Sequence, residues 1–182
     1  MAIVYLHGFA SVVKAKCMKY DGLGQIAPVH PFAPDYTQGF TAVLQSCMAF
    51  AASISSVSAV VGTSMGGYTA SHLAKQLDVP FVAINPAINP SQSLKKYIGK
   101  HQDYDGGEYE LSAEQVSSYP TYNHSGAGLI IVSNLDEVIP AQTTKDFAEH
   151  YNLPLISCDY GDHRFEDIST LIEQIDHHIA VR

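Results

Sequence analysis

A serine that could act as a nucleophile is Ser64, in the centre of a Gly-x-Ser-x-Gly pattern that spans residues 62–66. An apolar run over residues 59–61 precedes the pattern, and residues 68–77 are compatible with a helix. A strand, a sharp turn and a helix are the context in which this pattern forms a nucleophile elbow, because the strained turn requires glycine beside the serine. The alternative is an ordinary glycine–serine turn, and the flanking strand and helix favour the elbow.

A base must accept the proton of Ser64, because a serine hydroxyl is a weak nucleophile at neutral pH. In folds with this elbow, an acid and then a histidine follow the serine, each in a loop at the carboxyl end of a strand. Of the nine histidines in the chain, those late enough are His150, His163, His177 and His178. Three of them lie in helical patterns, whereas His163 follows the last predicted strand, so we predict His163 as the base. Its alternative role is to cap the following helix.

The carboxylate predicted to orient this histidine is Asp136. Asp136 and Glu137 both lie in the loop after the apolar run 129–132. We prefer Asp136, because a shorter and stiffer carboxylate is better suited to fix an imidazole. Asp162 is a weaker rival, since a residue next to His163 seldom turns back to its ring nitrogen. The alternative is that Asp136 belongs to an exposed acidic turn and has no catalytic role.

Two backbone N–H groups are predicted to bind the negative charge of a tetrahedral intermediate. One is the N–H of Met65, the residue after the nucleophile. The other is the N–H of Phe9 in the loop after the first strand. Gly8 precedes Phe9 and would let a substrate approach the backbone, so we predict that Gly8 contacts the substrate. We interpret His7 as structural.

The elements that must position these residues are six short apolar runs separated mostly by helical patterns. The predicted strands are residues 3–6, 26–29, 59–62, 81–84, 129–132 and 155–158, and the predicted helices are residues 13–20, 39–55, 68–77, 142–151 and 168–179. This alternation predicts one α/β domain over residues 1–182, with about six mostly parallel strands and helices on both faces. Pro28 places the second strand at an edge of the sheet, with Pro31 and Pro34 in the loop that follows.

Residues 91–125 are longer than a connection needs and are polar and rich in tyrosine. Such an insertion is often a lid or a binding loop and is otherwise mobile surface. We predict a small lid, with Tyr97 as a substrate-binding residue. The other tyrosines of the insertion could line a pocket or pack it onto the body of the domain; they are Tyr104, Tyr109, Tyr119 and Tyr122.

Composition argues against several classes of protein. The formal net charge of −8 disfavours broad nucleic-acid binding. No apolar run is long enough to anchor the chain in a membrane, and the histidine spacing offers no zinc pattern. Cys17, Cys47 and Cys158 suit reduced thiols, and no secretory signal is recognisable, so we expect a cytoplasmic protein without metal or cofactor. The oligomeric state is not predicted.

Taken together, these motifs resemble the YqiA-like esterases, a small bacterial family of the α/β-hydrolase superfamily. The resemblance runs over essentially the whole chain and keeps the motif order; it is carried by residues 5–11 (YLHGFAS), 14–16 (KAK), 62–68 (GTSMGGY), 85–87 (NPA), 136–138 (DEV) and 161–165 (GDHRF). It implies hydrolysis of acyl esters or thioesters, with Ser64, Asp136 and His163 as the triad. One departure is Leu135, where the family usually has glycine.

The sequence therefore predicts a serine hydrolase that acts on a small acyl ester. Short- to medium-chain esters are expected, because the polar insertion lacks the large apolar face of an interfacial lipase lid. One alternative is an acyl-CoA thioesterase. Another is a non-catalytic small-molecule binding protein that keeps the fold, since a fold alone does not establish a function.

Overall fold

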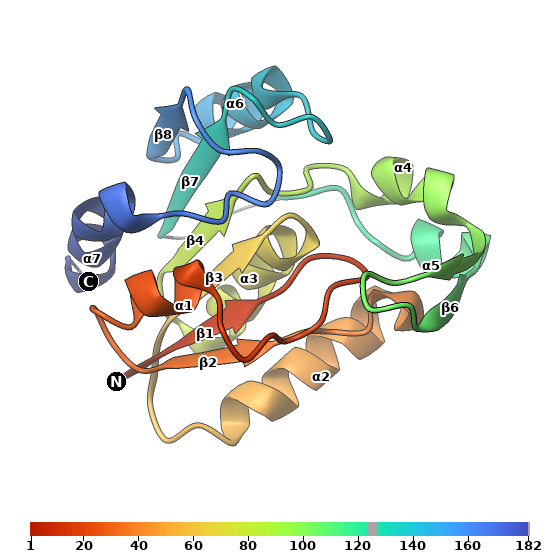
Figure 1. Cartoon of the computed structure of the whole chain (residues 1–182), viewed down its shortest axis with the longest axis horizontal. Helices are drawn as coiled ribbons and strands as arrows, with labels where there is room; N and C mark the ends of the chain where they lie inside the picture. The colour runs from red at the N-terminus through yellow and green to blue at the C-terminus, as the bar shows by residue number, and fades with distance from the viewer. Residues whose placement is uncertain (124–126, 182) are drawn as a thin grey trace.

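A sheet of six parallel strands forms the centre of the computed structural model, which describes residues 1–123 and 127–181 (Figure 1). The strands are β1 (Ala2–Leu6), β2 (Val29–Phe32), β3 (Val57–Thr63), β4 (Phe81–Ile84), β7 (Gly128–Ser133) and β8 (Leu155–Cys158). Their order in the sheet is β2-β1-β3-β4-β7-β8, and every neighbouring pair is parallel. The predicted α/β class is confirmed.

Helices cover both faces of this sheet because the strand side chains alternate between two apolar clusters. One cluster contains Leu6, Val60 and Ile130 and is covered by α2 (Phe40–Ala52), α3 (Met65–Leu77) and α6 (Ala141–His150). The other contains Tyr5, Val61 and Ile131 and is covered by α1 (Met18–Leu23), the 3-10 turn η3 (Ser169–Leu171) and α7 (Ile172–Ala180). Strands apolar on both sides are typical of a buried parallel sheet.

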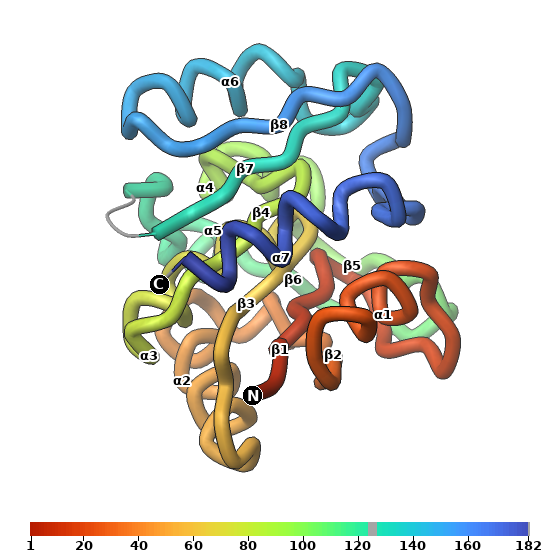
Figure 2. Tube along the Cα trace, turned by 90° about the vertical axis from the view of Figure 1, so that its left-hand side faces the viewer, coloured from red at the N-terminus to blue at the C-terminus, as the bar shows by residue number. Residues whose placement is uncertain are grey.

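The loops that follow the strands meet at one edge of the sheet. Figures 1 and 2 place the start of β1 and the end of α7 on the same side of the molecule, which faces the viewer in Figure 2. Parallel strands share the opposite, carboxyl edge, where ligands of α/β folds bind. The loops after β1, β3, β4, β7 and β8 therefore lie together.

Two predicted elements were placed wrongly. Residues 11–17 are irregular, and α1 begins only at Met18, because Val13 is exposed and residues 13–17 present no apolar stripe to the core. The second strand begins at Val29, not Ile26, because the N–H groups of residues 24–27 bond back to carbonyls of α1. Pro31, expected in a loop, lies in β2 opposite Tyr5, at an edge that tolerates its missing N–H.

The insertion predicted over residues 91–125 is built of short elements, and its last two residues lie outside the described ones. It contains α4 (Pro90–Ser93), the 3-10 turn η2 (Leu94–Tyr97), an antiparallel hairpin of β5 (Gly99–Gln102) and β6 (Glu108–Leu111), and α5 (Ala113–Ser117). A further 3-10 turn, η1 (Tyr36–Gln38), follows β2. In Figure 1, β6 and α5 lie on the side opposite α7, beyond the carboxyl edge of the sheet.

Tyrosines of the insertion divide into two groups. Tyr119 and Tyr122 are 1% exposed and pack in the core against Tyr68, so they attach the insertion to the body of the domain. Tyr109 lines a pocket, and Tyr104 is exposed at the hairpin tip.

Among the described residues, no helix has the length and apolar character that a bilayer span requires. All three cysteines are free thiols.

Candidate active site

Ser64 occupies a strained turn between β3 and α3. Its φ is 59° and its ψ is −122°, a conformation that costs a non-glycine residue about 1–3 kcal/mol. A Cβ on Gly62 would lie 2.2 Å from the Gly66 carbonyl oxygen, and a Cβ on Gly66 would lie 2.0 Å from the Leu6 carbonyl oxygen. Both positions of the pattern therefore exclude a side chain, which is the geometry of a nucleophile elbow.

The first loop lies directly against this elbow. A Cβ on Gly8 would be 3.2 Å from Ser64 Cβ and 3.7 Å from Ser64 Oγ. The hydroxyl of Tyr36 donates to the His7 carbonyl at 2.7 Å and fixes the start of the loop. Within residues 1–123 and 127–181, the N–H groups of Phe9 and Met65 have no acceptor. The two predicted oxyanion donors are thus available on loops in contact with each other.

His7 has a structural environment, as interpreted from the sequence. Its Nε2 forms a hydrogen bond with the Tyr20 hydroxyl. Burial, with nearby Lys19 and Lys14, lowers the pKa of His7 to about 4, so the ring is neutral at pH 7. A neutral ring held against Tyr20 supports α1 on the end of β1.

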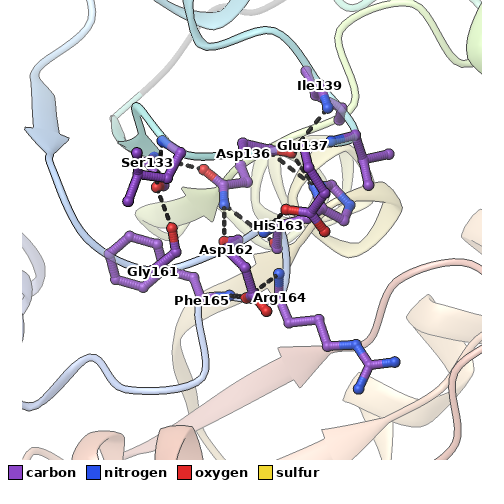
Figure 3. A network of polar contacts seen from close by, with 12 residues as sticks. Ser133, Asp136, Glu137, Ile139, Gly161, Asp162, His163, Arg164 and Phe165 are labelled. Atoms are coloured by element: carbon purple, nitrogen blue, oxygen red, sulfur yellow. Dashed lines mark hydrogen bonds and ion pairs between the residues drawn. The ribbon is translucent and has the colours of Figure 1, made fainter.

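The predicted acid and base are hydrogen-bonded to each other (Figure 3). Nδ1 of His163 lies 2.9 Å from each carboxylate oxygen of Asp136. The Asp136 side chain is 1% exposed and that of His163 is 14% exposed. Oδ1 of Asp136 also accepts the N–H groups of Val138 at 2.8 Å and Ile139 at 2.9 Å. The carboxylate is therefore fixed by its own loop before it meets the imidazole.

The rival acids have other partners. Oε2 of Glu137 accepts the backbone N–H of His163 at 2.9 Å. Oδ1 of Asp162 accepts the N–H groups of Arg164 and Phe165 in its own turn. Neither contacts the imidazole ring, so the geometry supports the choice of Asp136 in spite of Leu135.

No direct hydrogen bond joins Ser64 Oγ to His163 in the part of the chain that the structure describes. The two residues are connected through the end of β4, where the Ile84 carbonyl accepts the Ser64 N–H at 3.0 Å. The side chain of the next residue, Asn85, donates to the His163 carbonyl at 3.1 Å. Catalytic hydrogen bonds often tighten only when a substrate is bound, so this separation is compatible with a serine–histidine pair.

Strained backbone is concentrated at these loops. Of the six non-glycine residues with positive φ in the described ranges, four lie after β1, β3, β4 or β8: Ala10, Ser64, Asn85 and Phe165. Such residues persist only where the surrounding structure holds them, and they cluster at functional sites. The strain at Ser64 is expected from its motif, whereas that at Ala10, Asn85 and Phe165 is visible only in the backbone of the structure.

A pocket of about 460 Å³ opens beside the first loop and the insertion. Phe9 and Ala10 line it together with residues of the η1 region and of the β5–β6 hairpin. Tyr97 is not among its lining residues, but its ring lies 5.3 Å from that of Phe9. A substrate-binding role for Tyr97 remains a prediction.

The hairpin tip contacts two of the site's loops. The N–H of Tyr104 donates to the Ala10 carbonyl at 3.2 Å. The guanidinium of Arg164, next to His163, lies 4.8 Å from the centre of the Tyr104 ring. The insertion therefore reaches across from the loop after β1 to the loop after β8, which carries His163.

Two known proteins are similar in sequence to part of this chain. UPF0227 protein YcfP of Escherichia coli O9:H4 is 24% identical over 116 residues, which are 64% of this chain and 61% of that protein. A UPF0227 protein of Klebsiella pneumoniae is 22% identical over 116 residues, again 64% of this chain and 61% of that protein. The matched stretch thus spans less than two thirds of these relatives' length.

Two solved structures share the fold. Est1E from Butyrivibrio proteoclasticus superposes with a TM-score of 0.67 at 16% identity, covering 98% of this chain and 84% of that one. Mouse alpha/beta hydrolase domain-containing protein 10 gives 0.69 at 15% identity, covering 98% and 89%. The α/β-hydrolase fold is therefore confirmed. A family model described as an uncharacterised protein family, UPF0227, matches residues 2–180, and this chain belongs to that family, as its resemblance to the YqiA-like esterases indicated.

Proposed function

We propose that this protein is a serine hydrolase that cleaves short- to medium-chain acyl esters through an acyl-enzyme on Ser64. The observation that carries the proposal is the contact of His163 Nδ1 with both oxygens of Asp136 at 2.9 Å, on the sheet edge that also carries the strained Ser64. Two carboxylate contacts leave Nε2 of His163 as the ring nitrogen that can accept a proton.

In the proposed reaction, Ser64 Oγ attacks the acyl carbon while His163 Nε2 accepts the hydroxyl proton. The N–H groups of Phe9 and Met65 stabilise the oxyanion, and each such donor typically contributes about 10²–10³-fold to turnover. His163 then donates its proton to the leaving alkoxide. A water molecule, deprotonated by the same ring, releases the carboxylic acid and restores Ser64. Apart from the ester and water, the proposed reaction uses only groups of this chain.

Ser64 and His163 do not line the pocket beside Phe9, and we propose that this pocket holds the leaving group and favours an alcohol ester over an acyl-CoA thioester. Its walls carry four carboxylates, Asp35, Asp103, Glu108 and Glu110, and neither lysine nor arginine. CoA carries several negatively charged phosphates, and a pair of like charges at about 4 Å costs about 1 kcal/mol even in water. An uncharged alcohol and a short acyl chain avoid this repulsion.

A panel of acyl esters and acyl-CoAs of graded chain length tests the proposal. We expect kcat/KM to be highest for short or medium acyl esters and to be lower by about tenfold or more for the matching acyl-CoA, the effect of two like-charge contacts. Equal or faster turnover of acyl-CoA would establish the thioesterase alternative. A failure to turn over any member, together with no labelling of Ser64 by a fluorophosphonate, would favour a binding protein.

Replacing Asp136 with asparagine is expected to lower kcat by about 10⁴-fold, because the amide stabilises the wrong tautomer of the base. Glu137→Gln is the matched control; the amide oxygen of glutamine can still accept the His163 N–H that Glu137 binds, so we expect a change of less than about tenfold. Steady-state kinetics on the best ester of the panel measures both variants. A larger loss in Glu137→Gln than in Asp136→Asn would show that the acid is assigned to the wrong residue.

We also propose that the protein works in a reducing compartment such as the cytoplasm. Cys17, Cys47 and Cys158 are all free, and proteins of oxidising compartments usually pair their cysteines.

A further inference from the structure

The loop that carries His163 is held by side chains at four consecutive carbonyl groups. Ser133 Oγ donates to the Gly161 carbonyl at 2.5 Å. Asn85 Nδ2 donates to the carbonyls of Asp162 and His163, at 3.1 Å each. Lys19 Nζ donates to the Arg164 carbonyl at 2.6 Å. We call residues 161–164 the histidine loop and the three donors, Ser133, Asn85 and Lys19, the carbonyl cradle.

The three donors come from separate parts of the chain. Asn85 follows β4, Ser133 ends β7, and Lys19 lies in α1, which comes after the loop that follows β1. Figure 3 shows the hydrogen bond from Ser133 to Gly161. Surface loops usually satisfy their carbonyls with water or backbone. Here side chains determine where the histidine loop lies.

Asn85 uses both ends of its amide. Its Oδ1 accepts the N–H of Ser133 at 2.8 Å while its Nδ2 binds the histidine loop. The residue is 0% exposed and has a φ of 43°, a conformation that asparagine tolerates better than most residues. An aspartate would keep the shape and the acceptor but would place a carboxylate oxygen against two carbonyls.

Lys19 is a buried lysine with one hydrogen-bonded partner. It is 6% exposed, and in the described part of the chain the Arg164 carbonyl is the acceptor of its amine. The Tyr5 ring lies 5.8 Å from Nζ. Burial lowers the pKa of Lys19, and Cys17, Glu166 and Asp162 oppose this change. Charged or neutral, the amine can donate to the carbonyl, and lysine is rarely buried without a specific partner.

We infer that Lys19 and Asn85 are positioning residues, which hold the histidine loop so that His163 meets both Asp136 and the substrate-bound Ser64. The importance of this positioning for catalysis rests on the proposed function. Lys19 fastens the loop to the β1 side of the site and Asn85 fastens it to the β4 side, so the ring has little freedom to move away from the nucleophile. Neither residue touches the substrate.

The kinetic test compares Lys19→Met and Asn85→Asp with wild type. We expect kcat to fall by about 10–100-fold with KM changed less than twofold, because a misplacement of about 1 Å can cost about 10²-fold in rate. Fluorophosphonate labelling of Ser64 should be slower but still complete. Lys75→Met, at an exposed position of α3, is the matched control and should behave as wild type. Lys19→Arg, which keeps a cationic donor, should recover most of the lost kcat.

A second readout does not depend on turnover. The proton on His163 Nδ1 should give a low-field NMR resonance in wild type that is missing in His163→Ala. We expect this resonance to shift or broaden in Lys19→Met and Asn85→Asp and to be unchanged in Lys75→Met. If one variant fails to fold, the other decides the outcome, together with Lys19→Arg.

The two readouts separate the inference from the proposed function. If Lys19→Met and Asn85→Asp fold and keep the kcat and the NMR resonance of wild type, the inference is overturned, whereas the proposed hydrolase function is unaffected. A wild type without esterase activity whose resonance shifts or broadens in Lys19→Met and Asn85→Asp would overturn the proposed function, and the positioning of His163 would stand.

Discussion

Replacing Ser64 with alanine is expected to abolish ester hydrolysis, with kcat lowered by about 10⁶-fold, as is typical when the nucleophile of a triad is removed. The reason is chemical: without the Ser64 hydroxyl no acyl-enzyme forms, and water must attack the ester directly without covalent catalysis. The protein should remain folded, because Ser64 Oγ has no hydrogen-bond partner among the described residues and its removal leaves no buried group unsatisfied.

Two measurements check this expectation. Steady-state kinetics gives the loss in kcat, and a fluorophosphonate probe should label wild type once and leave Ser64→Ala unlabelled. Ser53→Ala is the control, since Ser53 is exposed at the end of α2 and its hydroxyl bonds only to the Phe50 carbonyl. Undiminished labelling of Ser64→Ala would mean that another residue is the nucleophile.

The central strands and the order of the site residues could be predicted from sequence because both depend on local patterns. Unbroken apolar runs indicate strands buried on both faces, and four of the predicted strands match β1, β4, β7 and β8 within one residue at each end. Once the strands are parallel, their carboxyl ends share one edge. Asp136 and His163 therefore meet, as predicted, although 26 residues lie between them.

The carbonyl cradle could not be predicted in this way. The contact between Lys19 and Arg164 spans 145 positions, and the periodicity around Lys19 suggested a helix that began five residues too early. Nothing in a single sequence distinguishes a lysine whose amine is buried on a distant carbonyl from one that is solvated. Asn85 belonged to a recognisable motif, yet its partners appear only when β4 and the histidine loop are side by side.

The insertion over residues 91–125 shows a second limit of prediction from the sequence. Its length predicted a lid or a binding loop, which stays a prediction, and its tyrosines were predicted to line a pocket or to pack the insertion onto the domain. The structure contains both kinds of tyrosine. Tyr119 and Tyr122 anchor it in the core, whereas the hairpin tip contacts Ala10 and Arg164. Composition cannot separate these roles, because the same side chain suits a core and a pocket wall.

Replacing His163 with alanine is the second change expected to have a very large effect, again about 10⁶-fold in kcat, because the base and the nucleophile of a triad act as one unit. Ser64 would keep its strained conformation but would have no group to accept its proton. Stability should change little, since the ring is near the surface and its partner Asp136 keeps its bonds to the N–H groups of Val138 and Ile139.

Kinetics of His163→Ala beside His150→Ala, an exposed histidine at the end of α6, measures this effect. His150→Ala should retain the activity of wild type. The double variant Ser64→Ala/His163→Ala should be no slower than either single variant, because residues that act as a unit are not additive. If the losses in kcat of the two single variants multiplied in the double variant, His163 would not be the base for Ser64. A kcat of His163→Ala within tenfold of wild type would also exclude His163 as the base. The outcome decides whether the contact with Asp136 belongs to a triad or only fixes a loop.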